Sequence, residues 1–165
     1  MVFDLPNKKS TQRARLRRYL RSHAFGYLQK SVWITPDPMH NEGEVLAGGK
    51  TNVESLILLE VRPCAGKTDA QIVAGAWDFE RINRSYAECI AILDQRPTGA
   101  LRDNATAKGF QRWAAAEHTT WLAAVSLDPL LPEPLLPQAY LGHQTWRKRI
   151  ELLRQASQQV RTFSD

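Results

Sequence analysis

The stretch FGYLQKSVWIT, residues 25–35, is rich in aromatic and β-branched side chains and is followed by Pro36. Side chains of these types favour extended backbone, and a proline cannot donate the hydrogen bond that would continue a strand. The stretch therefore predicts a strand or a tight hairpin that ends at residue 35. The rest of the N-terminal half can be interpreted outward from this β element.

Two more strands are predicted on either side of it. Residues 2–5, VFDL, form a short extended run that Pro6 stops, and residues 56–61, LILLEV, form an apolar run closed by Pro63. Residues 36–52 are rich in proline and glycine and carry only a weak helix signal. With a helix after the first strand, this order is the βαββαβ pattern. The sequence thus predicts an α+β protein that begins with a ferredoxin-like domain.

A basic amphipathic helix is predicted between the first two β elements. Ser10 or Thr11 can cap it, because their hydroxyl groups accept a hydrogen bond from a free backbone N–H, and the helix is expected to end near Ser22. At about 100° per residue, one face is apolar and the opposite face is cationic. The apolar face holds Leu16, Tyr19, Leu20 and His23, and the cationic face holds Arg17, Arg18 and Arg21.

From about residue 79 the pattern changes from strands to helices. Apolar side chains recur at helical spacing in residues 79–95, 106–127 and 144–162. Between the last two segments, PLLPEPLLP at residues 129–137 cannot be helix interior, because its four prolines lack N–H donors. We therefore expect two domains, a ferredoxin-like domain at residues 1–78 and a helical domain at residues 79–165.

Four tryptophans and the last helix supply further expected core residues. Trp33, Trp113, Trp121 and Trp146 all lie on apolar faces of their predicted elements, so core packing is the expected role. On the last helix, the side chains expected to face inward are Trp146, Ile150, Leu153 and Val160.

Charge is distributed unevenly along the chain. The net charge is +5; residues 1–30 hold eight basic side chains and one acidic one, which gives +7, so the remaining residues hold 14 basic and 16 acidic ones, which gives −2. A positive field confined to one segment favours an anionic neighbour at that segment. No long apolar run or secretory leader is present, and Cys64 and Cys89 do not make a disulfide framework, so we expect a cytoplasmic protein without membrane contact.

Several motifs, taken in order, resemble the PaaX family of bacterial repressors of phenylacetate degradation. The N-terminal ones are VFDLP at residues 2–6, LRRYL at 16–20 and FGYLQKSVWI at 25–34, and the C-terminal ones are AWDF at 76–79, LDPLLP at 127–132 and LLP at 135–137. The resemblance implies a middle domain similar to the small ferredoxin-like CRISPR-associated endoribonuclease. It also implies a regulatory rather than enzymatic body, a homodimer, and an aryl-CoA thioester such as phenylacetyl-CoA as effector.

The chain departs from the family in two places. The family begins with a winged helix-turn-helix that reads operator DNA, and this sequence has no such segment. Either the sequence is truncated or the protein is a natural partner without its own DNA reader, and operator contact is expected only through the missing segment. The family also carries a His-Glu pair and arginines shortly before the Asp-Pro, where this sequence has Thr119, Thr120, Leu122 and Ala123. That puts a shared ligand role of those positions in doubt.

The basic helix is the main candidate site for a nucleic acid or another anion. Lys8, Lys9, Arg17, Arg18 and Arg21 could pair with phosphates, and such binding would weaken as salt rises. The structural alternative is a solvated or internally paired helix face, which is the commoner role of a charge run.

Asp4 carries the competing enzymatic interpretation. The CRISPR-associated relatives imply that an aspartate at the end of the first strand can bind a divalent metal across a dimer and support phosphodiester cleavage. One carboxylate supplies too few ligands alone, and the structural alternative is an Asp that braces the following turn. A stand-alone metal-dependent nuclease therefore remains the alternative to a regulator, and a plain interaction module is a third hypothesis.

The remaining motifs support no cofactor. GKT at residues 49–51 and 66–68 resembles the end of a phosphate loop, but the required earlier glycine is replaced by Glu44 and Val61. The four histidines show no zinc spacing with each other or with the cysteines, and His23, on the apolar helix face, is expected in the core. We therefore expect no cofactor.

Overall fold

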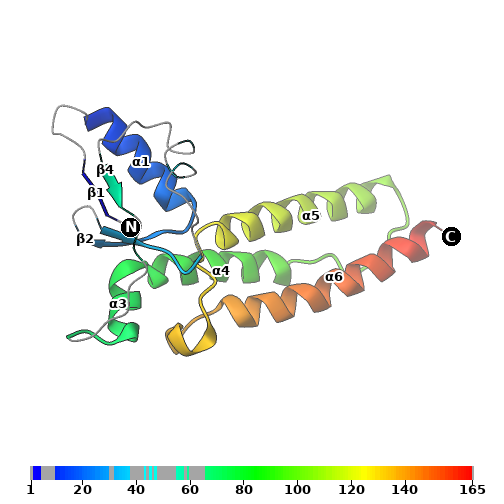
Figure 1. Cartoon of the computed structure of the whole chain (residues 1–165). Helices are drawn as coiled ribbons and strands as arrows, with labels where there is room; N and C mark the ends of the chain where they lie inside the picture. Colours follow the sequence, from blue (N-terminus) through cyan, green and yellow to red (C-terminus); the bar gives the residue numbers. More distant parts are fainter. Residues whose placement is uncertain are drawn as a thin grey trace. The chain divides into compact units, whose positions relative to one another are not determined.

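The computed structural model describes residues 2–4, 10–29, 32–37, 55–57 and 66–164, and the single residues 43, 45, 47 and 59. The chain divides into two compact units: unit 1 contains Met1–Phe79 and Ser126–Gln138, and unit 2 contains Glu80–Val125 and Ala139–Asp165. In Figure 1 the labelled strands belong to unit 1 and the long helices to unit 2. The domain boundary between residues 78 and 79 stays a prediction, but Ser126–Gln138 belongs to the N-terminal unit.

The described part of unit 1 contains a four-stranded sheet. Its strands are β1 (Val2–Asp4), β2 (Gly26–Gln29), β3 (Val32–Ile34) and β4 (Ser55–Ile57), so the stretch at residues 25–35 forms a hairpin. The strand order is β2-β3-β1-β4, and each pair of neighbours is antiparallel. β1 and β2 are therefore parallel with β3 between them, which is a split βαβ arrangement. The α+β class is confirmed.

Helix α1 (Ser10–Ser22) joins β1 to β2 and places its apolar stripe in the core of unit 1. Leu16, Leu20 and the hairpin residue Trp33 are each fully buried. Within the weakly helical stretch 36–52, the described residues Gly43, Val45 and Ala47 are helical, and Val45 is buried. Pro36 and Asp37 form an exposed bend, and the other residues of that stretch lie outside the described part of the chain.

Helix α3 (Asp69–Ala76) is an element that the sequence analysis did not identify. It begins with a capping box, in which the Thr68 hydroxyl accepts a hydrogen bond from the Gln71 N–H at 3.3 Å and the Gln71 side chain accepts one from the Thr68 N–H at 3.0 Å. The second GKT motif, residues 66–68, thus ends in the cap of this helix.

Trp77 of the AWDF motif packs against the hairpin at the end of α3. The Trp77 indole N–H donates a hydrogen bond to the Ala24 carbonyl at 2.8 Å, and Ala24 turns the chain with a φ of 56°. The ring covers Gly26 so closely that an added Cβ there would lie 2.7 Å from a Trp77 ring carbon. Only glycine fits under this indole.

Residues 126–138 form an irregular return to unit 1. Asp128 is buried, and its carboxylate accepts a hydrogen bond from the Leu130 N–H at 2.9 Å, which holds Leu130 at a φ of 50°. The short helix η2 (Glu133–Leu135) follows and contacts α3. One turn of 3₁₀ helix is compatible with proline near its start, so the exclusion of a helix interior here was correct.

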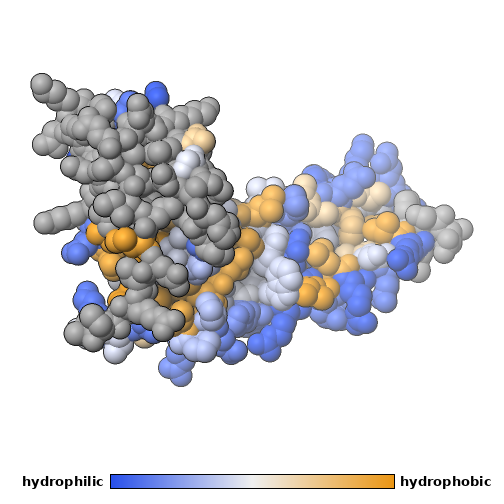
Figure 2. Space-filling model, in the orientation of Figure 1, coloured by the Kyte–Doolittle hydropathy of each residue, from blue (hydrophilic) through white to orange (hydrophobic). Residues whose placement is uncertain are grey.

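Unit 2 consists of α4 (Phe79–Asp94), α5 (Asn104–Val125) and α6 (Gly142–Ser164). All three helices were predicted, with ends displaced by at most two residues. In the view of Figure 2, hydrophilic residues line the outer edges of this unit and apolar residues lie along its middle. Phe110, Trp113 and Ala156 form a buried cluster on which Leu153 and Ile92 pack.

The inward face predicted for α6 is wrong at three positions. Trp146, Ile150 and Val160 are 50%, 51% and 40% exposed. Thr145 and Ala156 are buried instead, on a neighbouring stripe of the same helix. Core packing is therefore confirmed for Trp33, Trp113 and Trp121 but not for Trp146.

An ion pair inside unit 2 explains which stripe faces inward. Glu117 is 3% exposed, and its carboxylate accepts hydrogen bonds from the Arg149 guanidinium, with Nη2 3.5 Å from Oε2. The same guanidinium lies 4.6 Å from the centroid of the Trp121 ring, a cation–π contact. A buried carboxylate is very unfavourable without such a partner, so α6 must turn Arg149 towards α5.

Replacing Gly26 by alanine is expected to lower the free energy of unfolding by roughly 1–3 kcal/mol, because the new methyl group would overlap the Trp77 ring. Gly75→Ala is the matched control, since nothing lies within 4 Å of a Cβ at that helical position. We expect the control to be neutral or to stabilise by about 0.5–1 kcal/mol. Urea unfolding followed by circular dichroism checks both, and equal effects of the two changes would contradict the packing.

Removing one charge of the buried pair is expected to cost about 3–5 kcal/mol of stability, because the other charge stays buried without a partner. Arg149→Met keeps the apolar stem against Trp121 and isolates this effect. The double variant E117L/R149M should recover most of the loss. A double-mutant cycle in urea measures this, and additive losses would show that the two side chains do not interact.

Candidate functional site

The cationic face of α1 is the strongest candidate binding surface in unit 1. Arg18 and Arg21 are exposed, and Arg17 is half-buried at the edge of the apolar stripe. At about 100° per residue, the three guanidinium groups share a sector of about 100°. Burial of Leu16 and Leu20 fixes the rotation of α1 and so directs this sector away from the core. Arg15 is exposed on the same helix, which adds a further positive charge.

The structure places only part of the predicted anion site. Lys8 and Lys9 lie outside the described residues, so their relation to Arg17, Arg18 and Arg21 stays a prediction. Asp4 is the last residue of β1, and its backbone is paired with Ser55 of β4. The Asp4 carboxylate lies outside the described part of the structure, so its role in metal binding stays a prediction.

His23 does not lie in the core, contrary to expectation. It is exposed, with Nδ1 2.9 Å from the Tyr19 carbonyl oxygen and its ring 4.0 Å from the Tyr19 ring centroid. The position follows helical periodicity, but α1 ends at Ser22, so His23 leaves the apolar stripe at the C-terminus. Its neighbour Ala24 then begins the turn into β2.

Among the described residues, no group of three or more histidine, cysteine, aspartate or glutamate side chains could hold a metal ion. In the same part of the chain, no helix is both long and apolar enough to cross a membrane.

Sequence reasoning missed the polar centre of unit 2, formed by Glu117, Arg149 and the side chains around them. Glu117 lies one helical turn from both Trp113 and Trp121, so a carboxylate on an apolar stripe was the available signal. Cys89 and Thr120 adjoin this pair, and burial is the main reason that the pKa of the Cys89 thiol is raised. Cys89 is buried, and buried cysteines in such surroundings usually have a structural role.

The positions that differ from the family pattern occupy different surroundings. The hydroxyl groups of Thr119 and Thr120 donate to backbone carbonyls one turn earlier, at 2.9 Å in both cases. Leu122 is 53% exposed and Ala123 is exposed, so apolar side chains face solvent where the resemblance implied arginines. These four residues do not form an ionic site.

Comparison with known proteins covers both halves of the chain. Residues 1–73 match the family model of the PaaX protein central Cas2-like domain, and residues 77–165 match that of the PaaX-like protein C-terminal domain. Neither match includes a winged helix. No curated protein and no solved structure matches the chain significantly. The C-terminal match alone spans more than half of the sequence, and the chain therefore belongs to the PaaX family, of which it contains the central and C-terminal domains.

Proposed function

We propose that this chain is the regulatory and dimerisation body of a PaaX-like transcriptional repressor and is not an enzyme. The observation that supports this most is the succession of the two family domains over nearly the whole sequence. In this proposal, unit 1 has the complete ferredoxin-like fold. The split βαβ order and the helical backbone at Val45 both agree with that fold.

The proposed mechanism is a shift between two states of a homodimer. An aryl-CoA thioester would bind one state more tightly and thereby move the dimer away from the state that is competent for operator binding. Operator recognition itself is assigned to a winged helix outside this sequence. CoA is polyanionic, so guanidinium groups such as those on α1 are suitable neighbours for its phosphates.

The basic face, Lys8 and Lys9 together with Arg17, Arg18 and Arg21, is proposed as a non-specific phosphate-binding surface. Two of the arginines are exposed, and they share one side of a helix whose other side is anchored by Leu16 and Leu20. Contacts of this kind release counterions from DNA, so affinity should fall steeply as salt rises.

Reversing Arg17, Arg18 and Arg21 to glutamate is expected to abolish retention on duplex DNA at low salt while the protein stays folded. Each lost phosphate contact should reduce the slope of log K against log[salt] by about 1. A charge-matched control reverses three exposed arginines of unit 2, Arg102, Arg112 and Arg147. Fluorescence anisotropy with a labelled duplex measures binding. Equal losses of affinity in both triple variants would show that only the net charge of the protein matters, which would contradict a binding surface on α1.

Phenylacetyl-CoA is expected to raise the melting temperature, whereas CoA and phenylacetate alone should do so much less. A ligand that binds only the folded state adds about 2.7 kcal/mol of stability at a concentration 100 times its Kd. Differential scanning fluorimetry makes the comparison. An unchanged melting temperature over a panel of CoA thioesters would favour a plain interaction module instead.

The competing nuclease hypothesis is tested in the same preparations. Single-stranded RNA and duplex DNA are incubated with Mg²⁺ and either the native protein or Asp4→Ala. We expect no cleavage by either protein. Cleavage that is lost in Asp4→Ala would overturn the regulatory proposal.

A further inference from the structure

An exposed apolar strip lies on α5 and α6 and is not explained by the folding of unit 2. We call it the α5–α6 face and define it by Leu122, Trp146, Ile150 and Val160, which are between 40% and 53% exposed. The core of the unit is already filled by the buried residues of the neighbouring stripes. Clustered exposure of large apolar side chains marks an interaction site more often than an isolated exposed residue does.

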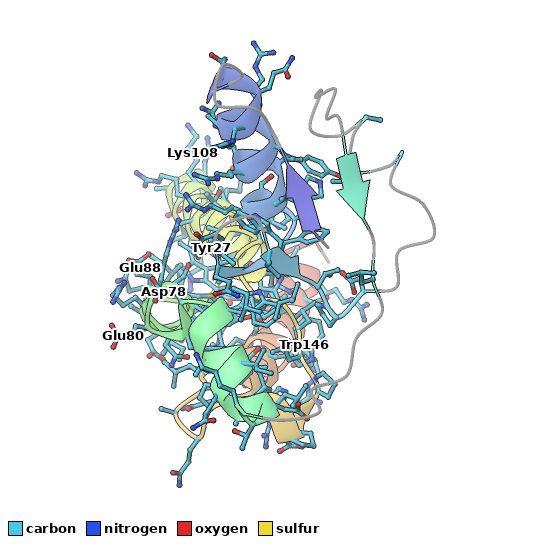
Figure 3. All side chains as sticks on the ribbon, turned by 60° about the vertical axis from the view of Figure 1, so that its left-hand side comes forward. Tyr27, Asp78, Glu80, Glu88, Lys108 and Trp146 are labelled. Atoms are coloured by element: carbon cyan, nitrogen blue, oxygen red, sulfur yellow. The ribbon has the colours of Figure 1, made fainter. Side chains whose placement is uncertain are left out.

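The four side chains lie on adjoining helices. The ring of Trp146 is 5.2 Å from that of Trp121, the residue that precedes Leu122, so Trp146 contacts α5 near this end of the strip. On α6, Trp146, Ile150 and Val160 fall within a sector of about 80° and extend over about 21 Å of helix. In Figure 3, Trp146 lies on the opposite side of unit 2 from Glu80 and Glu88 of α4.

The strip has the spacing of a helix-binding seam. The positions 146, 150, 153, 157 and 160 follow a heptad pattern of alternating four- and three-residue steps. Trp146, Ile150 and Val160 are its exposed apolar members, whereas Leu153 packs on the core. The exposed members occupy only about 80° of the circumference of α6. Such a narrow stripe fits the apolar edge of another helix better than a membrane surface, which needs a broad apolar face.

Two exposed arginines of α6 border the strip. Arg147 and Arg161 directly follow Trp146 and Val160 and form no ion pair with another described residue. Two further cations, Lys108 and Arg112, border a shallow hollow of about 490 Å³ elsewhere on α5, ten or more residues before Leu122. The only exposed carboxylate on these two helices is that of Glu151, which already accepts hydrogen bonds from Arg154 and Gln155, at 3.1 and 2.9 Å.

We propose that the α5–α6 face binds an amphipathic helix of a partner protein, with an apolar stripe flanked by acidic side chains. The stripe covers Leu122, Trp146 and Ile150, and the acidic flank meets Arg147 and Arg161 of α6. A second copy of this chain fits less well, because its own arginines would oppose those of the first copy. This binding role is independent of the proposed function.

The test uses the full chain and a synthetic peptide of about 20 residues with leucine at the a and d positions and glutamate at e and g. Binding is followed by the fluorescence anisotropy of a label on the peptide. Ile150→Glu should weaken binding about tenfold or more, because it places a like charge in the centre of the contact. The matched control is Ala87→Glu, which makes the same charge change at an exposed position of α4 and should bind like the native protein.

Three controls make the outcome decisive. A scrambled peptide of the same composition and a peptide with lysine in place of glutamate should both bind much more weakly. Thermal melting of both variants checks that they are folded, as expected for exposed positions.

The proposal is overturned if Ile150→Glu binds the peptide as well as Ala87→Glu does, or if the scrambled peptide binds equally. Sedimentation that shows a native dimer dissociated by Ile150→Glu would assign the face to a second copy instead. Vesicles of phosphatidylserine that retain the native protein but not Ile150→Glu would assign it to a lipid surface.

Discussion

The contact between the Trp77 indole and Gly26 is the constraint on which the arrangement of unit 1 depends. It joins the hairpin to α3 through a ring that leaves no room for a side chain beneath it, and the indole N–H satisfies the carbonyl of a strained turn residue. A hydrogen bond of this kind contributes roughly 1 kcal/mol, and burial of the ring contributes more. The residue that follows α3 is therefore held against the start of β2. Both family domains meet in the few residues around this tryptophan.

Periodicity predicted most helices correctly because their buried stripes are long and regular. It failed for α3, a short helix with small residues and no marked apolar face, whose clearest sign was the Thr68–Gln71 capping pair. Local sequence pattern alone was sufficient to predict the hairpin, α1 and the three long helices. The start of α3 is marked only by two polar side chains, which carry no hydrophobic signal.

The orientation of α6 shows a different limit of pattern reasoning. This helix has two neighbouring stripes, and the more apolar one, with Trp146, Ile150 and Val160, was expected inside. The buried stripe instead presents Arg149 to Glu117, because a carboxylate already committed to the interior of α5 requires a cation. The Glu117–Arg149 pair thus determined the rotation of α6, although several apolar side chains favoured another orientation. The candidate basic face on α1 could be identified from sequence, but the α5–α6 face could not, since it exists only because of this rotation.

Unit 1 is discontinuous in the chain, since Ser126–Gln138 returns to it after α4 and α5 have been made. During synthesis on the ribosome, the sheet and α1 must therefore wait for η2, which contacts α3, before their unit is complete. Ribosome-bound intermediates that end before residue 126 would expose the surface that this return covers. Chaperones are therefore expected to bind the nascent chain mainly after α3 has been translated and before the Asp128–Leu130 turn has been translated.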